Sequence, residues 1–207
     1  MIMSQSEQEK NKEWKETRKV ISAEFGIHRI YTRASLIYTK HKYGEGTVGA
    51  EVGVWTGDLS EVILAYLKPK ELYLLDAWAA YPDYIKELKS RNFNGEYLKQ
   101  EIWDDMYYGV CDRFKNNNNV KIIRSMSGED IRGVKDKELD WAYLDASHAE
   151  QYVYNDLFAW WPKIKDGGIL CGHDFLFPGV PLALDQFSRE MGLVVWPCGN
   201  DWWINKE

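Results

Sequence analysis

Short apolar runs alternate with amphipathic segments along most of the chain. The runs typical of strands are Val48–Val54, Leu72–Leu75, Val120–Ile123, Trp141–Leu144, Ile169–Cys171, Leu193–Trp196 and Trp202–Ile204. Between them, apolar residues recur with helical spacing at Leu59–Leu67 and at residues 149–161. This alternation predicts an α/β fold with a parallel sheet and helices on both faces. The sequence PCGND before the last run predicts a terminal antiparallel hairpin.

Two segments depart from this alternation. Residues 1–47 carry a helical pattern from Glu13 to about Lys42, and we expect the polar start of the chain to be disordered. Residues 48–207 then form the main domain. Within it, residues 77–116 are rich in aromatic side chains and longer than a plain crossover needs. They predict a helical cap over the substrate, or extra helices that only pack on the sheet.

Composition narrows the class of protein. The chain has 207 residues, of which 45% are hydrophobic, which is enough for one domain with a sizeable core. A net charge of −6 disfavours a nucleic-acid partner, because phosphate binding needs a basic face. No run of about 18 apolar residues predicts a membrane span, and the three cysteines form neither a metal nor a disulfide pattern. We therefore expect a cytoplasmic protein, with a homo-oligomer left open.

Residues 49–60, GAEVGVWTGDLS, form a glycine-rich turn between a predicted strand and a predicted helix. Such turns often hold a nucleotide. A phosphate-binding P-loop is excluded, because Gly57 is followed by Asp58 and Leu59 instead of Lys and Ser or Thr. A dinucleotide turn is disfavoured, since Trp55 occupies the place of the middle glycine and Asp58 puts a carboxylate where a pyrophosphate would lie.

A third ligand, S-adenosylmethionine, suits this turn better, because it has no phosphate and carries positive sulfonium and ammonium groups. Glu51, two residues before Gly53, can serve the ammonium end through water. Asp76 ends the second predicted strand, where its carboxylate can accept both ribose hydroxyls. The alternative interpretation of Asp76 is a helix cap.

Four more polar side chains follow later strands. Asp145 and His148 come after the fourth predicted strand, and His173 and Asp174 come after the fifth. Because ligands of open parallel sheets bind at the carboxyl ends of strands, we expect all four to converge near the glycine turn. Asp145, His173 and Asp174 can then hold a divalent cation, and His148 can accept a proton from a substrate hydroxyl. The alternative is that these side chains cap helices or face water.

Several stretches together resemble the class I S-adenosylmethionine-dependent methyltransferases. They are GAEVGVWTGDLSEVI, ELYLLDAW, LDWAYLDASHAEQYVYNDLFAWWPKIKDGGILCGHDF and PGVPLALDQF. The nearest branch includes the macrolide-sugar O-methyltransferases, and catechol O-methyltransferase is a more distant relative. The resemblance runs from about Val48 to Phe187 and implies a Rossmann-like seven-stranded sheet with helices on both faces and an antiparallel last strand.

The resemblance also implies roles for single residues. The implied cofactor-binding residues are Glu51, Gly53, Trp55, Gly57, Asp76, Ser127 and Asp145, with the segment up to Ser127 near the adenine. Asp145, His173 and Asp174 are the implied magnesium ligands, and His148 is the implied base. The chain departs from the family pattern at Trp55, which replaces a glycine, and at His173, which stands where an acidic residue often occurs.

The predicted function is S-adenosylmethionine-dependent O-methylation of a small hydroxylated acceptor such as a sugar, with or without magnesium. One alternative is an NAD-dependent sugar-nucleotide oxidoreductase, which Trp55, Asp58 and the terminal hairpin disfavour. The other is a non-catalytic cofactor-binding scaffold, which the intact His148 and its neighbouring carboxylates oppose. The expected partner is the small-molecule acceptor, with neither a nucleic acid nor a membrane.

Overall fold

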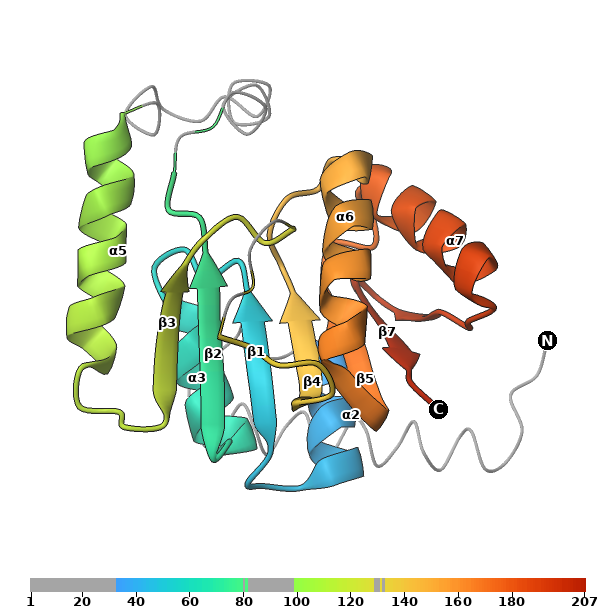
Figure 1. Ribbon diagram of the computed structural model, residues 1–207, viewed down its shortest axis with the longest axis horizontal. Coiled ribbons are helices and arrows are strands. Elements are labelled where there is room, and N and C mark those ends of the chain that lie inside the picture. The colour runs from blue at the N-terminus through green and yellow to red at the C-terminus, as the bar shows by residue number, and fades with distance from the viewer. Residues whose placement is uncertain (1–32, 80, 82–98, 129–130, 132) are drawn as a thin grey trace.

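A computed structural model gives the structure of residues 33–79, 81, 99–128, 131 and 133–207, and the statements below concern these described residues. Their strands form one seven-stranded sheet in the order β3-β2-β1-β4-β5-β7-β6 (Figure 1). The strands are β1 (Val48–Val52), β2 (Glu71–Asp76), β3 (Val120–Arg124), β4 (Leu139–Leu144), β5 (Ile164–Gly172), β6 (Trp196–Cys198) and β7 (Asp201–Asn205). β1 to β5 run parallel, whereas β7 is antiparallel to both β5 and β6. The predicted Rossmann-like sheet with an antiparallel last strand is confirmed.

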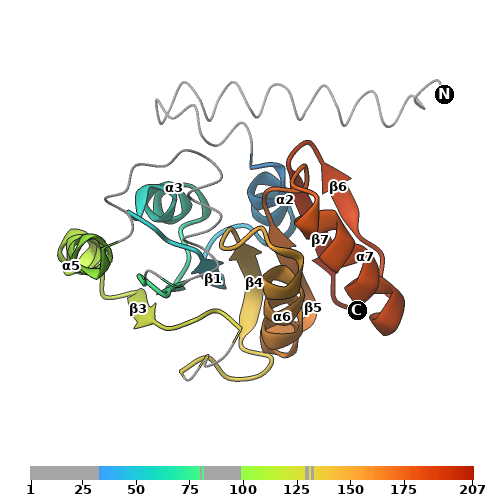
Figure 2. The same ribbon diagram turned by 90° about the horizontal axis from the view of Figure 1, so that it is seen from above.

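Helices cover both faces of the sheet (Figure 2). They are α2 (Ala34–Tyr43), α3 (Asp58–Leu67), α5 (Gln100–Phe114), α6 (Glu150–Trp160) with the short 3-10 helix η3 (Trp161–Lys163), and α7 (Gly179–Met191). Leu72 and Leu74 of β2 are buried in one core with side chains of α2, α3 and α5. Tyr73 and Leu75 are buried in a second core with side chains of α6 and α7. Because successive strand residues point to opposite faces, the buried centre of β2, Leu72–Leu75, lacks charged residues, as expected for a strand covered on both sides.

The terminal hairpin is present, but its first strand is shifted along the chain. The sequence predicts a strand at Leu193–Trp196, whereas β6 begins at Trp196 and ends at Cys198. Gly199 adopts a left-handed φ of 66° and allows a tight turn, after which Cys198 pairs with Asp201. The turn therefore sets the register, and the apolar residues just before Trp196 do not join the sheet.

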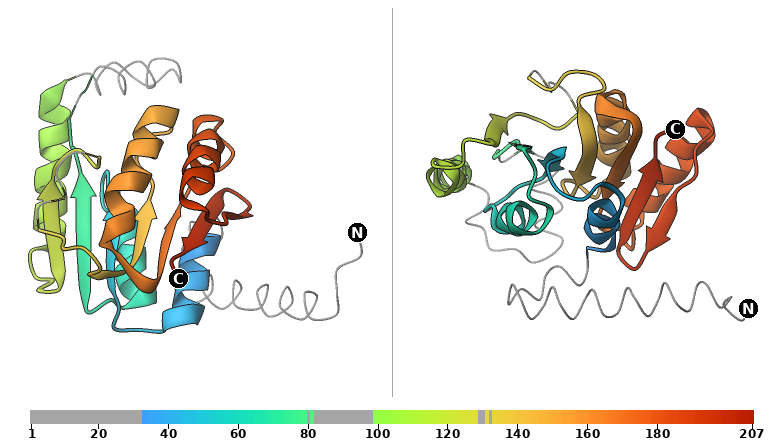
Figure 3. Two further views of the ribbon diagram at one scale, coloured as in Figure 1. Left: turned by 45° about the vertical axis from the view of Figure 1, so that its right-hand side comes forward. Right: turned by 90° about the horizontal axis from the view of Figure 1, so that it is seen from below.

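α2 is the described part of the predicted N-terminal helical segment. It packs against α3, β5 and β7, at the foot of the sheet (Figure 3). The expected disorder at the start of the chain lies outside the described residues. No helix in the described ranges has the length and apolar character needed to cross a membrane.

α5 is the part of the predicted cap that the structure describes in full, and residues 80 and 82–98 lie outside the described residues. Trp103, Val110 and Phe114 of α5 are buried in the core beside β2 and α3. This helix therefore packs on the sheet, as the alternative interpretation of residues 77–116 expects. A cap over the substrate stays a prediction for the rest of the segment.

Candidate active site

The glycine turn after β1 has the backbone that its sequence predicts. Gly53 has a φ of 92°, and a Cβ atom there would lie 2.2 Å from the carbonyl oxygen of Asp145, so a side chain has no room. Gly57 also has a left-handed φ, of 81°, where α3 begins. Trp55, at the place of the usual middle glycine, keeps a left-handed φ of 54°. The turn thus retains a glycine-like conformation at Trp55 and brings the ends of β1 and β4 together.

Asp76, at the end of β2, holds this turn in place. Its Oδ2 accepts hydrogen bonds from the backbone N–H groups of Val54 at 2.8 Å and Trp55 at 2.9 Å. Its Oδ1 accepts one from the backbone N–H of Trp78 at 2.8 Å. Burial raises the pKa of this carboxyl, and the backbone donors oppose that rise. Asp76 therefore caps a turn and not a helix, and because Oδ2 already accepts two donors, the remaining acceptor capacity lies on Oδ1.

Glu51 of β1 is a buried carboxyl that lines the same space. Its Oε2 accepts a hydrogen bond from the Ser60 hydroxyl at 2.5 Å, while Oε1 is buried without a partner. Burial raises the pKa of Glu51 to about 8. An unpaired acceptor in such a place costs free energy until a donor reaches it, so Glu51 is suited to a ligand that brings a positive donor.

Ser127, in the loop after β3, is fixed by a residue that the sequence analysis did not single out. Its hydroxyl donates to Oδ1 of Asp156 at 2.5 Å, and its carbonyl accepts from the indole N–H of Trp160 at 3.1 Å. Asp156 lies on α6 and is only 4% exposed. In the sequence, Asp156 is one of the polar positions of an amphipathic helix. Only the fold shows that the loop after β3 covers it.

The buried Asp156 leads to a prediction about stability and pH. Burial raises its pKa to about 7, above the ordinary value of 3.8. The folded state therefore binds this proton more tightly than the unfolded state, so the stabilisation is complete below about pH 4 and is lost as the pH rises through about 7. The Asp156→Asn side chain stays neutral at every pH. Between roughly pH 4 and pH 8, the free energy of unfolding of this variant should therefore rise by about 2–4 kcal/mol relative to that of the unchanged protein.

Urea unfolding at several pH values measures this difference. The matched control is Asp105→Asn on α5, because Asp105 is exposed. We expect the Asp105 variant and the unchanged protein to lose stability in parallel over this range. If the Asp156 variant followed the same curve, Asp156 would be ionised in the folded protein at low pH and its burial would carry no such cost.

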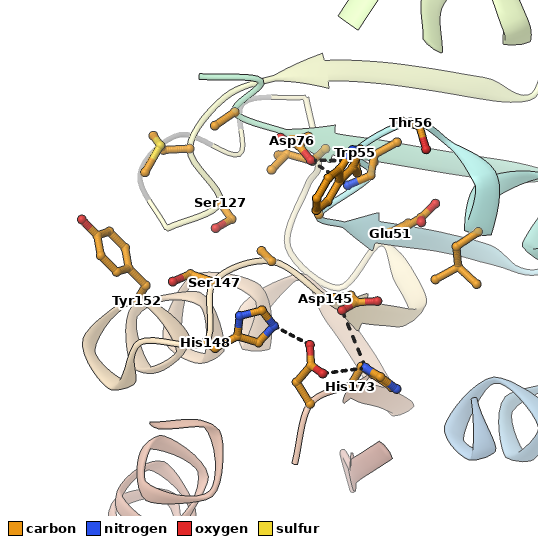
Figure 4. A pocket seen from close by; sticks show the side chains of 18 of the residues that line it. Glu51, Trp55, Thr56, Asp76, Ser127, Asp145, Ser147, His148, Tyr152 and His173 are labelled. Carbon is orange, nitrogen blue, oxygen red and sulfur yellow. Dashed lines mark hydrogen bonds and ion pairs between the residues drawn. The ribbon is translucent and has the colours of Figure 1, made fainter. Parts of the chain in front are cut away.

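The four polar residues predicted at the later strand ends converge (Figure 4). His148 Nε2 lies 2.5 Å from Oδ2 of Asp174, and His173 Nδ1 lies 3.0 Å from its Oδ1. His173 Nδ1 is 3.9 Å from Oδ1 of Asp145, which is beyond hydrogen-bond distance. Asn200, in the hairpin turn, donates to Asp174 Oδ1 at 3.1 Å. The side chains thus form one cluster, in which Asp174 joins both imidazoles.

Asp174 is the best-stabilised anion of this cluster. Burial opposes its ionisation, but the hydrogen bonds from His148 and His173 outweigh burial and hold the pKa of Asp174 well below its usual range. Its backbone has a left-handed φ of 59°, a conformation that short polar residues tolerate better than most. A buried carboxylate beside His148 fixes the orientation of that ring, as in the acid–base pairs of many enzymes.

A second set of residues, which the sequence analysis missed, supports the cluster from below. Arg33, just before α2, donates from Nη1 to the Tyr143 hydroxyl at 2.9 Å and pairs through Nη2 with Oδ2 of Asp145 at 3.0 Å. Asp201 of β7 accepts from Tyr143 at 3.2 Å and from the hydroxyl of Ser35 at 2.6 Å. Burial raises the pKa of Asp201 to about 6. This network joins the N-terminal segment to β4 and β7 beneath Asp145.

One cavity of about 590 Å³ lies at the carboxyl ends of the strands. The predicted site residues that line it are Glu51, Gly53, Trp55, Asp76, Ser127, Asp145, His148, His173 and Asp174. Gly57 is the exception, because it faces Phe114 of α5 and serves the turn only. The ring centroids of Tyr81 and Tyr152 lie 5.7 Å apart at the cavity, and the ring of Phe177 contacts that of His148 in a tilted arrangement, with centroids 4.7 Å apart.

With this geometry in view, the comparison with known families is decisive. Residues 50–175 match the family described as a methyltransferase domain. The chain belongs to this methyltransferase family. The match spans more than half of the 207 residues and confirms the resemblance to class I methyltransferases. It also sets aside the nicotinamide-dependent oxidoreductase. No curated protein sequence matches the chain.

Solved structures agree with this methyltransferase at the level of the fold. The O-methyltransferase NovP is 14% identical with a TM-score of 0.59, over 83% of this chain and 79% of NovP. The N-methyltransferase NodS from Bradyrhizobium japonicum is 11% identical with a TM-score of 0.55, over 89% and 99%. SMU.1697c from Streptococcus mutans, in complex with SAH, is 13% identical with a TM-score of 0.56, over 84% and 97%. Identities this low carry the fold alone.

Proposed function

We propose that this methyltransferase transfers the methyl group of S-adenosylmethionine to a hydroxyl of a small acceptor, such as a sugar. The observation that carries the proposal is the pairing of two kinds of group in one cavity. Glu51 and Asp76 end neighbouring strands on one side, and the His148–Asp174 pair stands on the other. The first two suit the cofactor and the second two suit deprotonation of an acceptor.

The cofactor half of the cavity is acidic, which favours a positive ligand without phosphate. Glu51 presents a buried, unpaired oxygen to an ammonium group, and Oδ1 of Asp76, which accepts one backbone N–H from Trp78, suits a ribose hydroxyl. Ser127, held by Asp156, would lie near the adenine. The complex of SMU.1697c with SAH, the demethylated product of this cofactor, supports the same ligand class on this fold.

The acceptor half supplies a base with a fixed ring. His148 donates from Nε2 to Asp174, which is the tautomer that leaves the lone pair on Nδ1 as the basic site. In the proposed step the acceptor oxygen attacks the methyl carbon in line, the O–C bond forms and the S–C bond breaks. The hydroxyl proton goes to His148, and the sulfonium becomes a neutral thioether. Positioning of the two reactants can contribute about 7–11 kcal/mol.

The aromatic rings at the cavity suit a compact, partly apolar acceptor. Tyr81 and Tyr152 lie together at its wall, and Phe177 contacts the ring of His148 in a tilted arrangement. Aromatic rings can orient a sugar or a flat hydroxylated molecule by packing against it, and they exclude water from the reacting oxygen. We propose that the segment containing Tyr81 covers the acceptor, as the predicted cap over residues 77–116 implies.

The donor set also fits a divalent cation. Asp145, His148 and Asp174 each offer a ligand atom, and these atoms all lie within 4.8 Å of one another. The predicted set has His173 in place of His148, and both imidazoles touch Asp174. Two carboxylates with one imidazole suit magnesium or manganese. A cation held by Asp145 and Asp174 would lower the pKa of the acceptor hydroxyl.

Magnesium should therefore bind without cofactor or acceptor. At roughly ten times its Kd, we expect it to raise the melting temperature by about 3–6 °C. Asp145→Asn should abolish that rise, and the exposed Asp105→Asn should keep it. Two results together would exclude a metal from the mechanism: a melting temperature that magnesium does not change, and full turnover in excess chelator. The His148–Asp174 pair would then act without a cation.

Transfer of a labelled methyl group tests the function as a whole. The protein is incubated with methyl-tritiated S-adenosylmethionine and panels of sugars, phenols and amines, and the label is followed into product. We expect label on a hydroxylated acceptor and an equal amount of S-adenosylhomocysteine. Label on amines alone would contradict O-methylation. No transfer to any class, with intact cofactor binding, would favour the non-catalytic scaffold.

A further inference from the structure

Among the described residues, two buried side-chain atoms have no hydrogen-bond partner. They are Nε of Arg33 and Oε1 of Glu51. Both residues line the cavity of the candidate site. A buried donor or acceptor without a partner costs about 1–3 kcal/mol. Two such atoms at one cavity indicate a ligand that supplies the missing partners.

The two atoms differ in chemistry and complement each other. Arg33 offers a cationic N–H donor, whereas Glu51 offers a carboxyl oxygen. A ligand that satisfies both carries an anionic acceptor close to a positive donor. The carboxylate and ammonium of an α-amino acid have this arrangement, and the methionine end of S-adenosylmethionine is such a zwitterion.

The charges around the cavity make Arg33 necessary for such a ligand. The acidic residues on the described part of its wall are Glu51, Asp58, Asp76, Asp145 and Asp174. Arg33 is the single Arg or Lys among the described residues there. Without Arg33, a ligand carboxylate would lie among acidic residues only, and electrostatic repulsion would oppose its binding.

Arg33 is also held where it can act. Its Nη1 is bonded to Tyr143 and its Nη2 to Asp145, so the planar guanidinium has a fixed direction. Tyr143 lies in β4 and Asp145 directly follows this strand, which pairs with β1, the strand that carries Glu51. Figure 4 shows Asp145 and Glu51 at the same cavity. The family match begins at residue 50, so Arg33 comes from this chain's own N-terminal segment.

We propose that Arg33 binds the carboxylate of the cofactor's methionine end while Glu51 faces its ammonium group, an assignment that rests on the proposed cofactor. The N-terminal segment then completes the cofactor site, and Arg33 selects ligands with a free carboxylate. Asp145 acts as a positioning residue for the guanidinium.

The test compares ligands that differ only at this end. Calorimetry measures the affinities of S-adenosylhomocysteine and of methylthioadenosine, which lacks the amino acid. Each ligand is titrated into the unchanged protein and into the Arg33→Met variant. We expect Arg33→Met to weaken the binding of S-adenosylhomocysteine by about 10- to 100-fold. The affinity for methylthioadenosine should change by no more than about twofold. Arg189→Met, on the exposed face of α7, is the matched control and should change neither.

Each outcome decides a separate question. Equal losses for both ligands would show that Arg33 only supports the fold of the site, and unchanged affinity for both would also overturn the proposal. If Arg33→Met fails to fold, the unchanged protein still tests it, because decarboxylated S-adenosylhomocysteine should then bind about 10- to 100-fold more weakly than the parent. Failure of the unchanged protein to bind S-adenosylhomocysteine at all would refute the proposed cofactor.

Discussion

Replacing His148 by alanine is expected to lower turnover by about 10²–10⁴-fold, with the affinity for S-adenosylhomocysteine nearly unchanged. The reason is that a sugar hydroxyl is a poor nucleophile until its proton is removed. His148 is the imidazole that Asp174 orients at 2.5 Å, and its ring faces the acceptor half of the cavity beside Phe177.

The comparison needs two further variants once label transfer has provided an acceptor. Asp174→Asn keeps the shape of the pair but removes the charge that orients and stabilises the protonated ring, so we expect a loss of the same order. His41→Ala, exposed on α2, is the matched control and should keep full turnover. Full turnover of the His148 variant would mean that positioning alone drives the reaction.

Asp76→Ala is expected to weaken S-adenosylhomocysteine binding by about 1.5–3 kcal/mol, or roughly 10- to 150-fold. Two effects act in the same direction. The variant removes acceptors for the ribose hydroxyls, and it removes the group that binds the backbone N–H groups of Val54 and Trp55. The turn then loses the cap that holds its left-handed residue, Trp55, in place.

Asp76→Asn separates these two effects. Its amide oxygen can still accept from Val54 and Trp55, but its NH2 group then faces the backbone N–H of Trp78 and offers the ribose no acceptor. A loss in the asparagine variant close to that of the alanine variant would assign Asp76 to the ligand. Unchanged affinity in both, by calorimetry, would leave Asp76 as a turn cap only. Asp105→Ala is the exposed control for charge.

The strand pattern could be predicted because β1, β2 and β4 are buried on both faces and carry mainly apolar residues. β5 departs from this rule. It starts at Ile164 and passes through the polar residues KDGG before its apolar half, so the sequence predicted only the part near Ile169–Cys171. Gly167 donates to the carbonyl of Lys206, and Gly168 packs so closely on Ile164 that a Cβ would lie 2.5 Å from it. Pairing with the end of the chain extends the strand there, and local composition does not reveal such pairing.

The cluster could also be predicted, since parallel strands bring Asp145, His148, His173 and Asp174 to one edge whatever the side chains are. The contacts between these residues could not. Arg33 reaches Tyr143 across 110 positions of sequence, and its surroundings, IYTRASLIY, have no motif that indicates a site. Its role depends on where α2 docks, which is a matter of tertiary packing and not of local pattern.

The most direct test of the account is a calorimetric titration of the unchanged protein with S-adenosylhomocysteine and, in the same buffer, with NAD. The cavity holds buried carboxyl groups at Glu51 and Asp76, and its described wall has no cradle for a pyrophosphate, since Trp55 and Asp58 occupy that part of the turn. The account predicts binding of S-adenosylhomocysteine with a Kd of about a micromolar or less, near −8 kcal/mol, and no measurable heat with NAD. Tighter binding of NAD, or no binding of S-adenosylhomocysteine, would contradict it.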